Sequence, residues 1–389
     1  MIRSFTVVFA ALAATSILTA APKVDVTRAG AARIVVTLET PESTPAAKAF
    51  NTSLRRNLGI SGFFQVGPNG QIKVSGTPGA GVQAAGAGKL VKSTAAFAAA
   101  DAKAARMAAR ELSDALVQAH TGKKGFACDR IAFADRKGKD NGELYMCYPD
   151  GYDIVQLTHD RHAVVGPRWA PNKQEIFYTG FLQQKPLVYR INTAGQRSLL
   201  AQFKGLATGA AMTADGRRCA IILSHQGNPE LYVYDLGAKM INRMTRTLSA
   251  SEASPCWSPN ASKIVYVTDL SRQPQIYLLD VASKKSSRIT NTGSQNTNPD
   301  WGADGRIVYA SKRAGENVLV VMDPLKGESS AQVVTKPGSW EHPSWAADCR
   351  HVIAERDGAL FIVDTDPNGD PPVQLFRNAG HWMNPAWSR

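Results

Sequence analysis

Apolar and polar residues alternate over short stretches through most of the chain, and small or polar residues separate the stretches. In one such region Ile264 and Tyr266, and further along Ile276 and Leu278, occupy alternate positions. A period of two is typical of a strand with one buried face. Gly, Pro, Asn and Ser at the junctions are turn signals. Residues 254–290 therefore predict four short antiparallel strands, a sheet too small to be stable without neighbours.

The same arrangement recurs along the chain at a nearly constant distance. Each copy contains Pro-x-Trp followed by a polar turn, except one copy in which Ala210-Ala-Met212 stands in its place. The anchor residues are Trp169, Met212, Trp257, Trp301, Trp345 and Trp387. Successive anchors are 42 to 45 residues apart. A period in the low forties with four strands per unit is typical of a β-propeller and not of a helical solenoid, so six anchors predict six blades.

The two ends of the repeat region complement each other. Trp387 lies two residues from the C-terminus, so the last unit has room for one strand only. Residues 130–135, 143–147 and 154–158 read as three strands that come before any anchor. We therefore expect the C-terminal strand to pair with the first of them, which closes the ring and removes free sheet edges. The predicted fold class is an all-β six-bladed propeller over residues 126–389.

The first third of the chain has a mixed pattern. A strand, a helix, two short strands and a second helix are expected in that order, at residues 33–38, 46–58, 63–66, 71–74 and 104–118. The helices have apolar residues on one face, and a Pro-Asn-Gly turn signal separates the two short strands. Residues 75–100 are rich in Gly and Ala and predict no defined element. Residues 21–122 are therefore expected to form a small α+β domain with an N-terminal tail.

The N-terminus carries the features of an export signal. Arg3 supplies a positive charge, residues 5–18 form an apolar run, and residues 19–21 are small. This pattern predicts a secretory signal peptide at residues 1–20, with an apolar core too short for a comfortable membrane span. No Cys follows the expected cleavage site, so no lipid anchor is predicted. The mature protein is expected to be soluble and periplasmic, without a transmembrane segment.

The basic character of the chain is concentrated at its front. Of a net charge of +13, residues 1–125 contribute 15 Lys and Arg against 6 Asp and Glu, and the remainder contributes 30 against 26. A basic region can suit an anionic partner. No run of Lys and Arg with interleaved aromatic residues marks a nucleic-acid groove. A solvated basic surface is the simpler interpretation, and no nucleic-acid partner is predicted.

The five cysteines leave two interpretations open. They are Cys128, Cys147, Cys219, Cys256 and Cys349. An oxidising compartment permits disulfides. The candidate pairs are Cys128 with Cys147 and Cys219 with Cys256. Small buried residues in strands are the alternative. No Cys-x-x-Cys or Cys/His spacing indicates a metal.

Several motifs resemble those of one known family. They are Thr-Gly-Lys-Lys-Gly-Phe at 121–126 with Arg-Ile-Ala-Phe at 130–133, Pro-Cys-Trp-Ser-Pro-Asn at 255–260 with Gln-Ile-Tyr-Leu-Leu-Asp at 275–280, Gly-Ser-Gln-Asn at 293–296 and Pro-Ala-Trp-Ser at 385–388. With them the chain resembles the TolB family, the periplasmic component of the Tol-Pal system of Gram-negative bacteria. The resemblance covers residues 121–389, extends loosely over 32–66, and departs from the family's pattern between 67 and 103. It implies that the propeller binds a Pal-like peptidoglycan-associated lipoprotein and that the mature N-terminus binds a TolA-like inner-membrane-anchored protein.

No pattern in the sequence indicates a reaction. There is no Gly-x-Ser-x-Gly elbow and no phosphate-cradling Gly-rich loop. The histidines are scattered among the blades, and the densest polar cluster is residues 159–162. Asp residues recur in turns and at strand ends, where turn hydrogen bonds explain them. The sequence therefore predicts no catalytic residue, no metal site and no cofactor.

The loop before each anchor is expected to lie on one rim around the central channel. Aligning the copies on their anchors gives the predicted partner-binding residues, which are His162, Glu252, Gln295, Asn296, Thr297, Trp340, Glu341, His342, His381, Trp382 and Met383. Trp340 and Trp382 each lie five residues before an anchor. Either they pack against a neighbouring blade or they form an aromatic hot spot. The resemblance places the TolA-like contact at the tail, at Val24, Asp25 and Val26.

The leading hypothesis is a non-catalytic periplasmic adaptor that couples layers of the cell envelope, supporting envelope integrity and outer-membrane constriction during division. Two alternatives remain. One is an exported propeller hydrolase or lyase that uses His162, His342 or His381 in the channel. The other is a carbohydrate-binding propeller with Trp340 and Trp382 as stacking platforms. Affinity for a folded protein would favour the adaptor, and affinity for isolated glycans would favour the carbohydrate-binding protein.

Overall fold

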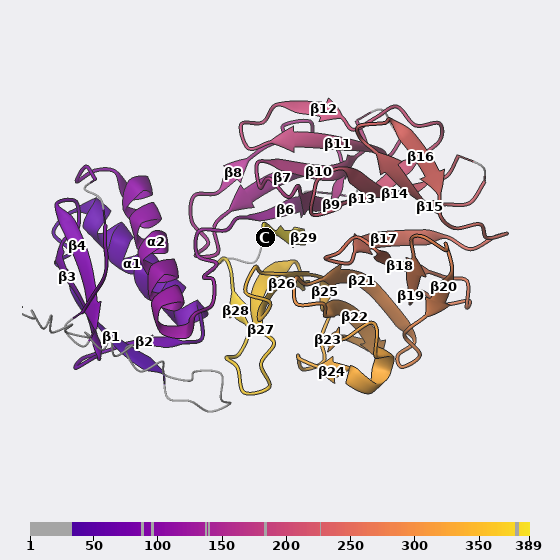
Figure 1. Ribbon diagram of the computed structural model, residues 1–389. Helices are drawn as coiled ribbons and strands as arrows, with labels where there is room; N and C mark the ends of the chain where they lie inside the picture. The colour runs from indigo at the N-terminus through magenta and orange to yellow at the C-terminus, as the bar shows by residue number, and fades with distance from the viewer. Residues whose placement is uncertain are drawn as a thin grey trace, which may run out of the picture.

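The protein consists of a ring of six antiparallel sheets with a smaller α/β domain beside it (Figure 1). The computed structural model describes residues 33–86, 89–94, 97–136, 138, 141–182, 185–225, 227–377 and 381–389. The expected signal peptide and the tail residues Val24, Asp25 and Val26 lie outside these ranges. The predicted six-bladed propeller is confirmed.

The N-terminal domain contains a five-stranded sheet in the order β2-β1-β3-β4-β5. Its strands are β1 (Ile34–Glu39), β2 (Phe64–Val66), β3 (Ile72–Thr77), β4 (Gly81–Gly86) and β5 (Lys89–Ser93). β2 and β3 flank β1 and pair with it in parallel, so the Pro-Asn-Gly turn between them does not make a hairpin. β4 and β5 continue the sheet in antiparallel fashion. Residues 75–100 thus contain β4 and β5, where no defined element was expected; the buried residues of β4, Val82 and Ala84, are small and give a weak strand pattern.

Two helices cover one face of this sheet. Helix α1 (Pro45–Ile60) begins after Thr44, whose hydroxyl accepts a hydrogen bond from the Ala47 amide at 3.1 Å. Helix α2 (Ala102–Thr121) ends at Gly122, which has a left-handed φ of 70°. The apolar faces of both helices pack against the alternate residues of the sheet that are buried, in one core. The opposite face of the sheet carries polar residues.

Each blade is a four-stranded antiparallel sheet whose first strand lies innermost. Blade 1 comprises β29 (Trp382–Trp387), β6 (Ile131–Arg136), β7 (Gly142–Cys147) and β8 (Val155–Gln156). Blade 2 comprises β9 (Val164–Trp169), β10 (Glu175–Gly180), β11 (Leu187–Asn192) and β12 (Arg197–Leu199). Blade 3 comprises β13 (Ala207–Met212), β14 (Arg218–Leu223), β15 (Glu230–Asp235) and β16 (Met240–Arg243). Blade 4 comprises β17 (Glu252–Trp257), β18 (Lys263–Thr268), β19 (Gln275–Asp280) and β20 (Ser286–Arg288). Blade 5 comprises β21 (Gln295–Trp301), β22 (Ile307–Arg313), β23 (Glu316–Met322) and β24 (Gln332–Val333), with a short 3₁₀ helix, η1 (Gly327–Ser330). Blade 6 comprises β25 (Glu341–Trp345), β26 (His351–Arg356), β27 (Ala359–Asp364) and β28 (Val373–Gln374).

The C-terminal strand closes the ring as predicted. In blade 1, β29 pairs with β6, with Trp387 opposite Ile131. Backbone and side-chain hydrogen bonds between Arg130 and Ser388, at 2.8 and 2.7 Å, extend this pairing. The innermost strand of blade 1 therefore comes from the end of the chain and the other three strands come from its front.

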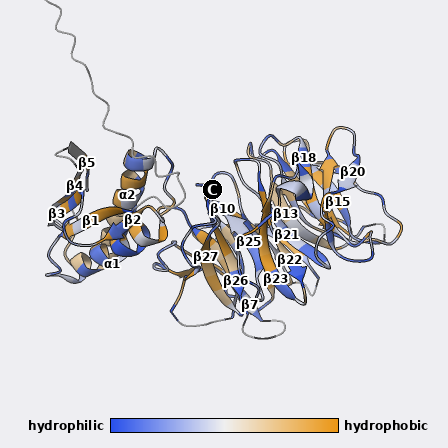
Figure 2. Ribbon diagram, turned by 90° about the horizontal axis from the view of Figure 1, so that it is seen from below, coloured by the Kyte–Doolittle hydropathy of each residue, from blue (hydrophilic) through white to orange (hydrophobic). Residues whose placement is uncertain are grey.

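The anchor residues pack into the seams between blades. Trp257 contacts the core of blade 3, Trp301 that of blade 4 and Trp345 that of blade 5. The indole N–H of Trp257 donates to the Ala211 carbonyl of the preceding blade at 3.0 Å. Apolar residues are accordingly concentrated in the strands (Figure 2). The repeat spacing exists because each blade needs one large side chain to fill the seam behind it.

A recurring threonine holds the short fourth strand in four blades. It lies two residues beyond the strand, and its hydroxyl accepts a hydrogen bond from a backbone amide of the third strand. The pairs are Thr158 with Leu144 at 2.9 Å, Thr245 with Leu231 at 2.9 Å, Thr290 with Ile276 at 3.0 Å and Thr335 with Leu319 at 2.9 Å.

All five cysteines are free, and three of them are buried in strands. The interpretation as small buried residues therefore holds in this structure, and neither candidate disulfide is formed.

The two ends of the channel differ. We call the end at which the innermost strands begin the mouth face, and the end at which they finish the linker face. The N-terminal domain contacts turns of the linker face. Arg110 of α2 forms a fully buried ion pair with Asp150, at 2.9 Å, and Arg33 pairs with Asp370 of blade 6. The described residues of the N-terminal domain line no part of the cavity at the mouth face. Among the described residues, no helix has the length and apolar character that a membrane span requires.

Candidate functional site

The centre of the ring contains two cavities. One, of about 230 Å³, opens at the mouth face and is lined by Gly166, Gly209, Ser254, Asn298, His342 and Asn384, together with adjoining prolines and small residues. The other, of about 470 Å³, lies toward the linker face and is lined by Lys124, Met212 and several anchor indoles. Arg168 lines both.

The six residues named at the mouth share one backbone conformation. Each lies three residues before an anchor, and each has φ between 48° and 58°. The pairing register of every innermost strand shifts at this position, which marks a β-bulge. A left-handed φ costs least for Gly and is tolerated better by Asn and His than by most residues. The bulges re-aim the strands at the channel opening, which gives the mouth a fixed shape.

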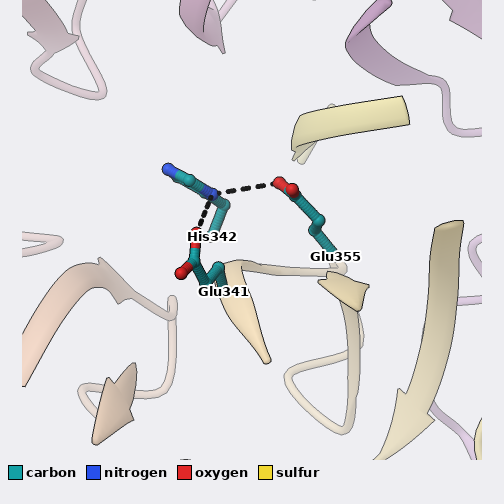
Figure 3. A group of neighbouring side chains, drawn as sticks. All are labelled: Glu341, His342 and Glu355. Carbon is teal, nitrogen blue, oxygen red and sulfur yellow. Dashed lines mark hydrogen bonds and ion pairs between the residues drawn. The ribbon is translucent and has the colours of Figure 1, made fainter. Parts of the chain in front are cut away.

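His342 lies between two carboxylates at this mouth (Figure 3). Its Nδ1 is 3.1 Å from Glu355 Oε2 and 3.8 Å from Glu341 Oε2. Its Nε2 is 3.2 Å from Asn384 Nδ2. The Gly166 amide donates to Asn384 Oδ1 at 3.0 Å, which fixes the orientation of that side-chain amide. Nε2 is therefore the acceptor. Nδ1 carries the ring proton and donates a hydrogen bond to Glu355.

These hydrogen bonds, which we call the His342 relay, join three blades. The relay runs from Gly166 of blade 2 through Asn384 of blade 1 to His342 and Glu355 of blade 6. The backbone N–H of Asn384 also donates to Glu355 Oε2 at 3.0 Å. The relay therefore fixes the His342 ring in one tautomer at the mouth.

The composition of this group would also suit a metal ion. Ligand atoms of Glu341, His342 and Glu355 lie within 4.8 Å of one another, and no other such group of three occurs in the described part of the chain. A metal on Nδ1 would require that nitrogen to be deprotonated. The proton would then sit on Nε2, facing the Asn384 amide donor. The hydrogen bonds thus fit a relay better than a metal site.

An ion-pair group spans the channel between opposite blades. Asp300 of blade 5 is buried and accepts hydrogen bonds from Arg168 of blade 2 at 2.9 Å and from Arg389 at 2.8 and 3.2 Å. The Trp345 amide donates to it at 2.8 Å. Burial alone would raise the pKa of Asp300, but Arg389 and Arg168 outweigh burial and hold this pKa below its usual value. The last residue of the chain therefore helps to tie the ring across its centre.

Three predicted rim residues are not displayed on the rim. Glu252, Asn296 and Trp340 are all buried, and only 1% of Trp340 is exposed. All three lie five residues before an anchor, a position whose side chain enters the seam with the preceding blade. The ring of Trp340 packs edge-on against Phe361, with centroids 5.6 Å apart, and its N–H donates to the Lys336 carbonyl at 3.0 Å. The expectation that these side chains face a partner is corrected on this ground.

Trp382 occupies the same position in blade 1 and is only partly buried. Its ring packs edge-on against Phe133 and Tyr145, with centroids 5.1 and 5.6 Å away, and against Phe376 at 5.4 Å. Trp340 therefore offers no free ring face of the kind that a sugar-stacking platform needs, and Trp382 is held within an aromatic cluster.

The remaining predicted residues lie at the mouth face but do not form one cavity. His162 and His381 are exposed, and Gln295, Thr297, Glu341, His342 and Met383 are partly buried. His162 and Met383 line a separate cavity of about 420 Å³ with Arg136 and Phe181. His342 lines the channel mouth, so His162, His342 and His381 share no cavity among the described residues.

Sequence reasoning missed the residues that shape the mouth. Ser254, Asn298 and Asn384 were passed over, although their constant distance of three residues from an anchor was visible in the repeat. Thr208 also lines this cavity. The signal was the recurrence of Gly, Ser, Asn and His at one repeat position, because these residues tolerate a left-handed φ or favour turns.

Comparisons with known proteins agree with this architecture. The family model "TolB beta propeller domain" matches residues 117–389. The protein TolB homolog of Chlorobium luteolum is 23% identical over 276 residues, which are 70% of this chain and 63% of that protein. The crystal structure of TolB from Acinetobacter baumannii superposes with a TM-score of 0.78 at 22% identity, covering 93% of this chain and 98% of that one. A putative TolB from Agrobacterium tumefaciens gives 0.51 at 19% identity, covering 66% and 92%. At these identities the structures show the shared fold.

Proposed function

Because the chain belongs to the TolB beta-propeller family, we propose that it is a non-catalytic adaptor protein of the bacterial cell envelope. The adaptor acts in the periplasm. It binds a Pal-like peptidoglycan-associated lipoprotein on the propeller and a TolA-like inner-membrane-anchored protein through its N-terminal region. In this way it supports envelope integrity and constriction of the outer membrane during division.

The observation that carries the proposal is the open mouth of the channel. The N-terminal domain contacts the opposite end of the ring, so the mouth face is left free for a partner. The mouth is lined by small and polar side chains on six fixed bulges. Such a preformed hollow suits a projecting loop of a folded protein, because little ordering is needed on binding.

The structure narrows the proposed contact residues. Ser254, Asn298, His342 and Asn384 line the mouth, and Glu341 lies beside His342. A second set would form the surround on the same face, namely His162, Gln295, Thr297, His381, Trp382 and Met383. The tail residues Val24, Asp25 and Val26 remain the proposed contact for the TolA-like protein.

The absence of a catalytic role is part of the proposal. In the relay, His342 has both ring nitrogens engaged, by Glu355 and Asn384. A general base needs a free nitrogen that reaches its substrate. The separation of His162 and His342 into different cavities also argues against a shared active site.

Two alanines at opposite ends of the channel give a matched test. Ala253 lines the mouth, Ala303 lines the cavity of the linker face, and both are exposed. Ala253→Trp should fill the mouth and weaken binding of the soluble domain of the organism's own Pal-like lipoprotein by about tenfold or more. Ala303→Trp should leave the affinity unchanged. Titration calorimetry on both variants measures this.

Equal affinity of both variants and the unmodified protein would show that the channel mouth is not the binding site. No binding of the lipoprotein domain by the unmodified protein would reject the proposed partner itself. Melting curves confirm that each variant is folded.

A further inference from the structure

Three leucines stand exposed on the mouth face, over blades 2 to 4. Leu206 is 45% exposed, Leu270 is 56% exposed and Leu248 is fully exposed. Leu206 and Leu248 lie in the loops that lead into blades 3 and 4, and Leu270 lies in the hairpin between β18 and β19. We call these residues the leucine patch. Isolated exposed leucines are common on protein surfaces, but several on adjoining loops mark an interaction site.

Hydrogen bonds hold these loops beside one another. The Ser224 amide donates to the Leu206 carbonyl at 3.1 Å, which joins the first loop to blade 3. Asn228 Nδ2 donates to Thr247 Oγ1 at 2.8 Å, and the Ser251 amide donates to Asp269 Oδ1 at 2.8 Å. The chain of contacts runs from the Leu206 loop through the Leu248 loop to the Leu270 hairpin.

Each leucine of the patch has a cation two residues away in the sequence. The cations are Lys204, Arg246 and Arg272, and all three are exposed. None of them forms an ion pair with any residue that the structure describes. The one exposed carboxylate described in these loops, Asp269, accepts the Ser251 amide. The patch therefore combines protruding apolar side chains with a net positive charge, because three cations face one exposed carboxylate.

This combination matches a membrane surface better than a protein partner. Hot spots of protein interfaces are enriched in Trp, Tyr and Arg and poor in Leu, and Lys is depleted there. None of the three leucines lines the mouth cavity, the linker-face cavity or the cavity beside His162. At a bilayer, apolar side chains enter the headgroup–acyl boundary while Lys and Arg meet anionic headgroups.

We propose that the mouth face binds the surface of an anionic phospholipid bilayer through the leucine patch. Leu206, Leu248 and Leu270 enter the boundary region, and Lys204, Arg246 and Arg272 contact lipid phosphates. This contact needs no protein partner and does not depend on the adaptor function. Its geometry would bring the channel mouth close to a membrane.

Vesicle co-sedimentation tests the proposal directly. The protein without its expected signal peptide is mixed with phosphatidylcholine vesicles that contain or lack phosphatidylglycerol. Binding is expected only to the anionic vesicles, and it should fall as salt is added, because salt screens the headgroup attraction. The variant with Leu206→Ser, Leu248→Ser and Leu270→Ser should bind about tenfold or more weakly, since it loses the apolar insertion.

Leu325 offers a matched control. It is 67% exposed and adjoins Lys326, but it lies between β23 and β24 on the linker face, and Lys326 pairs with Asp323 at 3.4 Å. Leu325→Ser should bind anionic vesicles like the unmodified protein. Ala303→Trp, also on the linker face, should do so as well.

Two results would overturn the proposal. One is no binding of the unmodified protein to anionic vesicles at low salt. The other is equal vesicle binding by the unmodified protein and the triple serine variant, with both shown to be folded by their melting curves. Loss of lipoprotein affinity in the serine variant, without vesicle binding by any form, would instead assign the patch to a protein partner.

Discussion

At the seam between blades 3 and 4, two buried carboxyl groups stand where the next seam has two amides. Between blades 4 and 5, Asn296 Nδ2 donates to Gln275 Oε1 at 2.8 Å. The corresponding residues one seam earlier are Glu252 and Glu230, and each has one buried carboxyl oxygen without a hydrogen-bond partner. Two carboxylates cannot make the bond that the amides make. A proton on one of them would supply the missing donor.

The surroundings decide that the proton stays on Glu252. Burial, and then the charge of Glu230, raise the pKa of Glu252 to about 8, and Asp269 adds to this. Burial also acts on Glu230, but hydrogen bonds from Thr245 and Thr247 and the pairing with Arg243, at 2.9 Å, lower its pKa. The two carboxyl groups lie in one seam, yet the pKa of Glu252 is raised and the pKa of Glu230 is lowered.

A folded-state pKa of Glu252 above its unfolded value makes stability depend on pH. The unfolded protein releases this proton near the ordinary pKa of glutamate and the folded protein only near 8. The contribution is therefore fully present below the unfolded pKa and is lost as pH rises toward 8. Glu252→Gln should raise stability at pH 8 by about 1–3 kcal/mol and change it little at pH 4.5. Urea unfolding at both values measures this.

Glu230→Gln is the matched control for this prediction. It removes the partner of Arg243 and should destabilise the protein at neutral pH, by about 1–3 kcal/mol. An identical pH dependence in Glu252→Gln and the unmodified protein would show that Glu252 is ionised like an ordinary surface residue.

At the scale of the element, the innermost strand depends on its bulge. The bulge residues of blades 5 and 6 are Asn298 and His342, with φ of 52° and 48°. The Asn298 side chain takes part in none of the hydrogen bonds given above for the mouth. A change at Asn298 therefore tests mainly the backbone conformation.

Asn298→Ala should therefore destabilise the protein by about 1 kcal/mol, because a β-carbon is unfavourable at this φ. Asn298→Gly should be neutral or slightly stabilising at the same position. Chemical denaturation of both variants measures the difference. Thr297→Ala, one residue earlier and outside the left-handed region, is the control. Equal stability of the Ala and Gly variants would mean that the bulge imposes no backbone cost.

At the scale of the molecule, stability depends on closure of the ring. Removal of residues 385–389 takes Trp387 from the last seam and Arg389 from Asp300, and it leaves Ile131 and Ala132 of β6 unpaired. The truncation should lower the free energy of unfolding by about 5 kcal/mol or more. Calorimetric melting measures this loss. Arg389→Ala, which removes only the ion pair, should lose less. Melting of the truncated protein within about two degrees of the full chain would contradict the closed ring.

The sequence alone determined the architecture of the propeller. Strand alternation is a local pattern, and the anchors recur because every blade has the same seam to fill, so the blade number and the closing strand could be read from spacing alone. The helices of the N-terminal domain also followed from local signals. The parallel placement of β2 and β3 around β1 did not, because a turn signal says nothing about which strand a segment joins.

Only the tertiary structure decided which residues are available to a partner. The repeat placed Glu252, Asn296 and Trp340 before an anchor, but whether such a side chain faces solvent or a seam depends on the neighbouring blade. The His342 relay joins three blades, and the leucine patch joins three loops. These groups form from residues far apart in the chain, since burial, hydrogen-bond partners and adjoining surfaces depend on long-range packing that a local pattern does not contain.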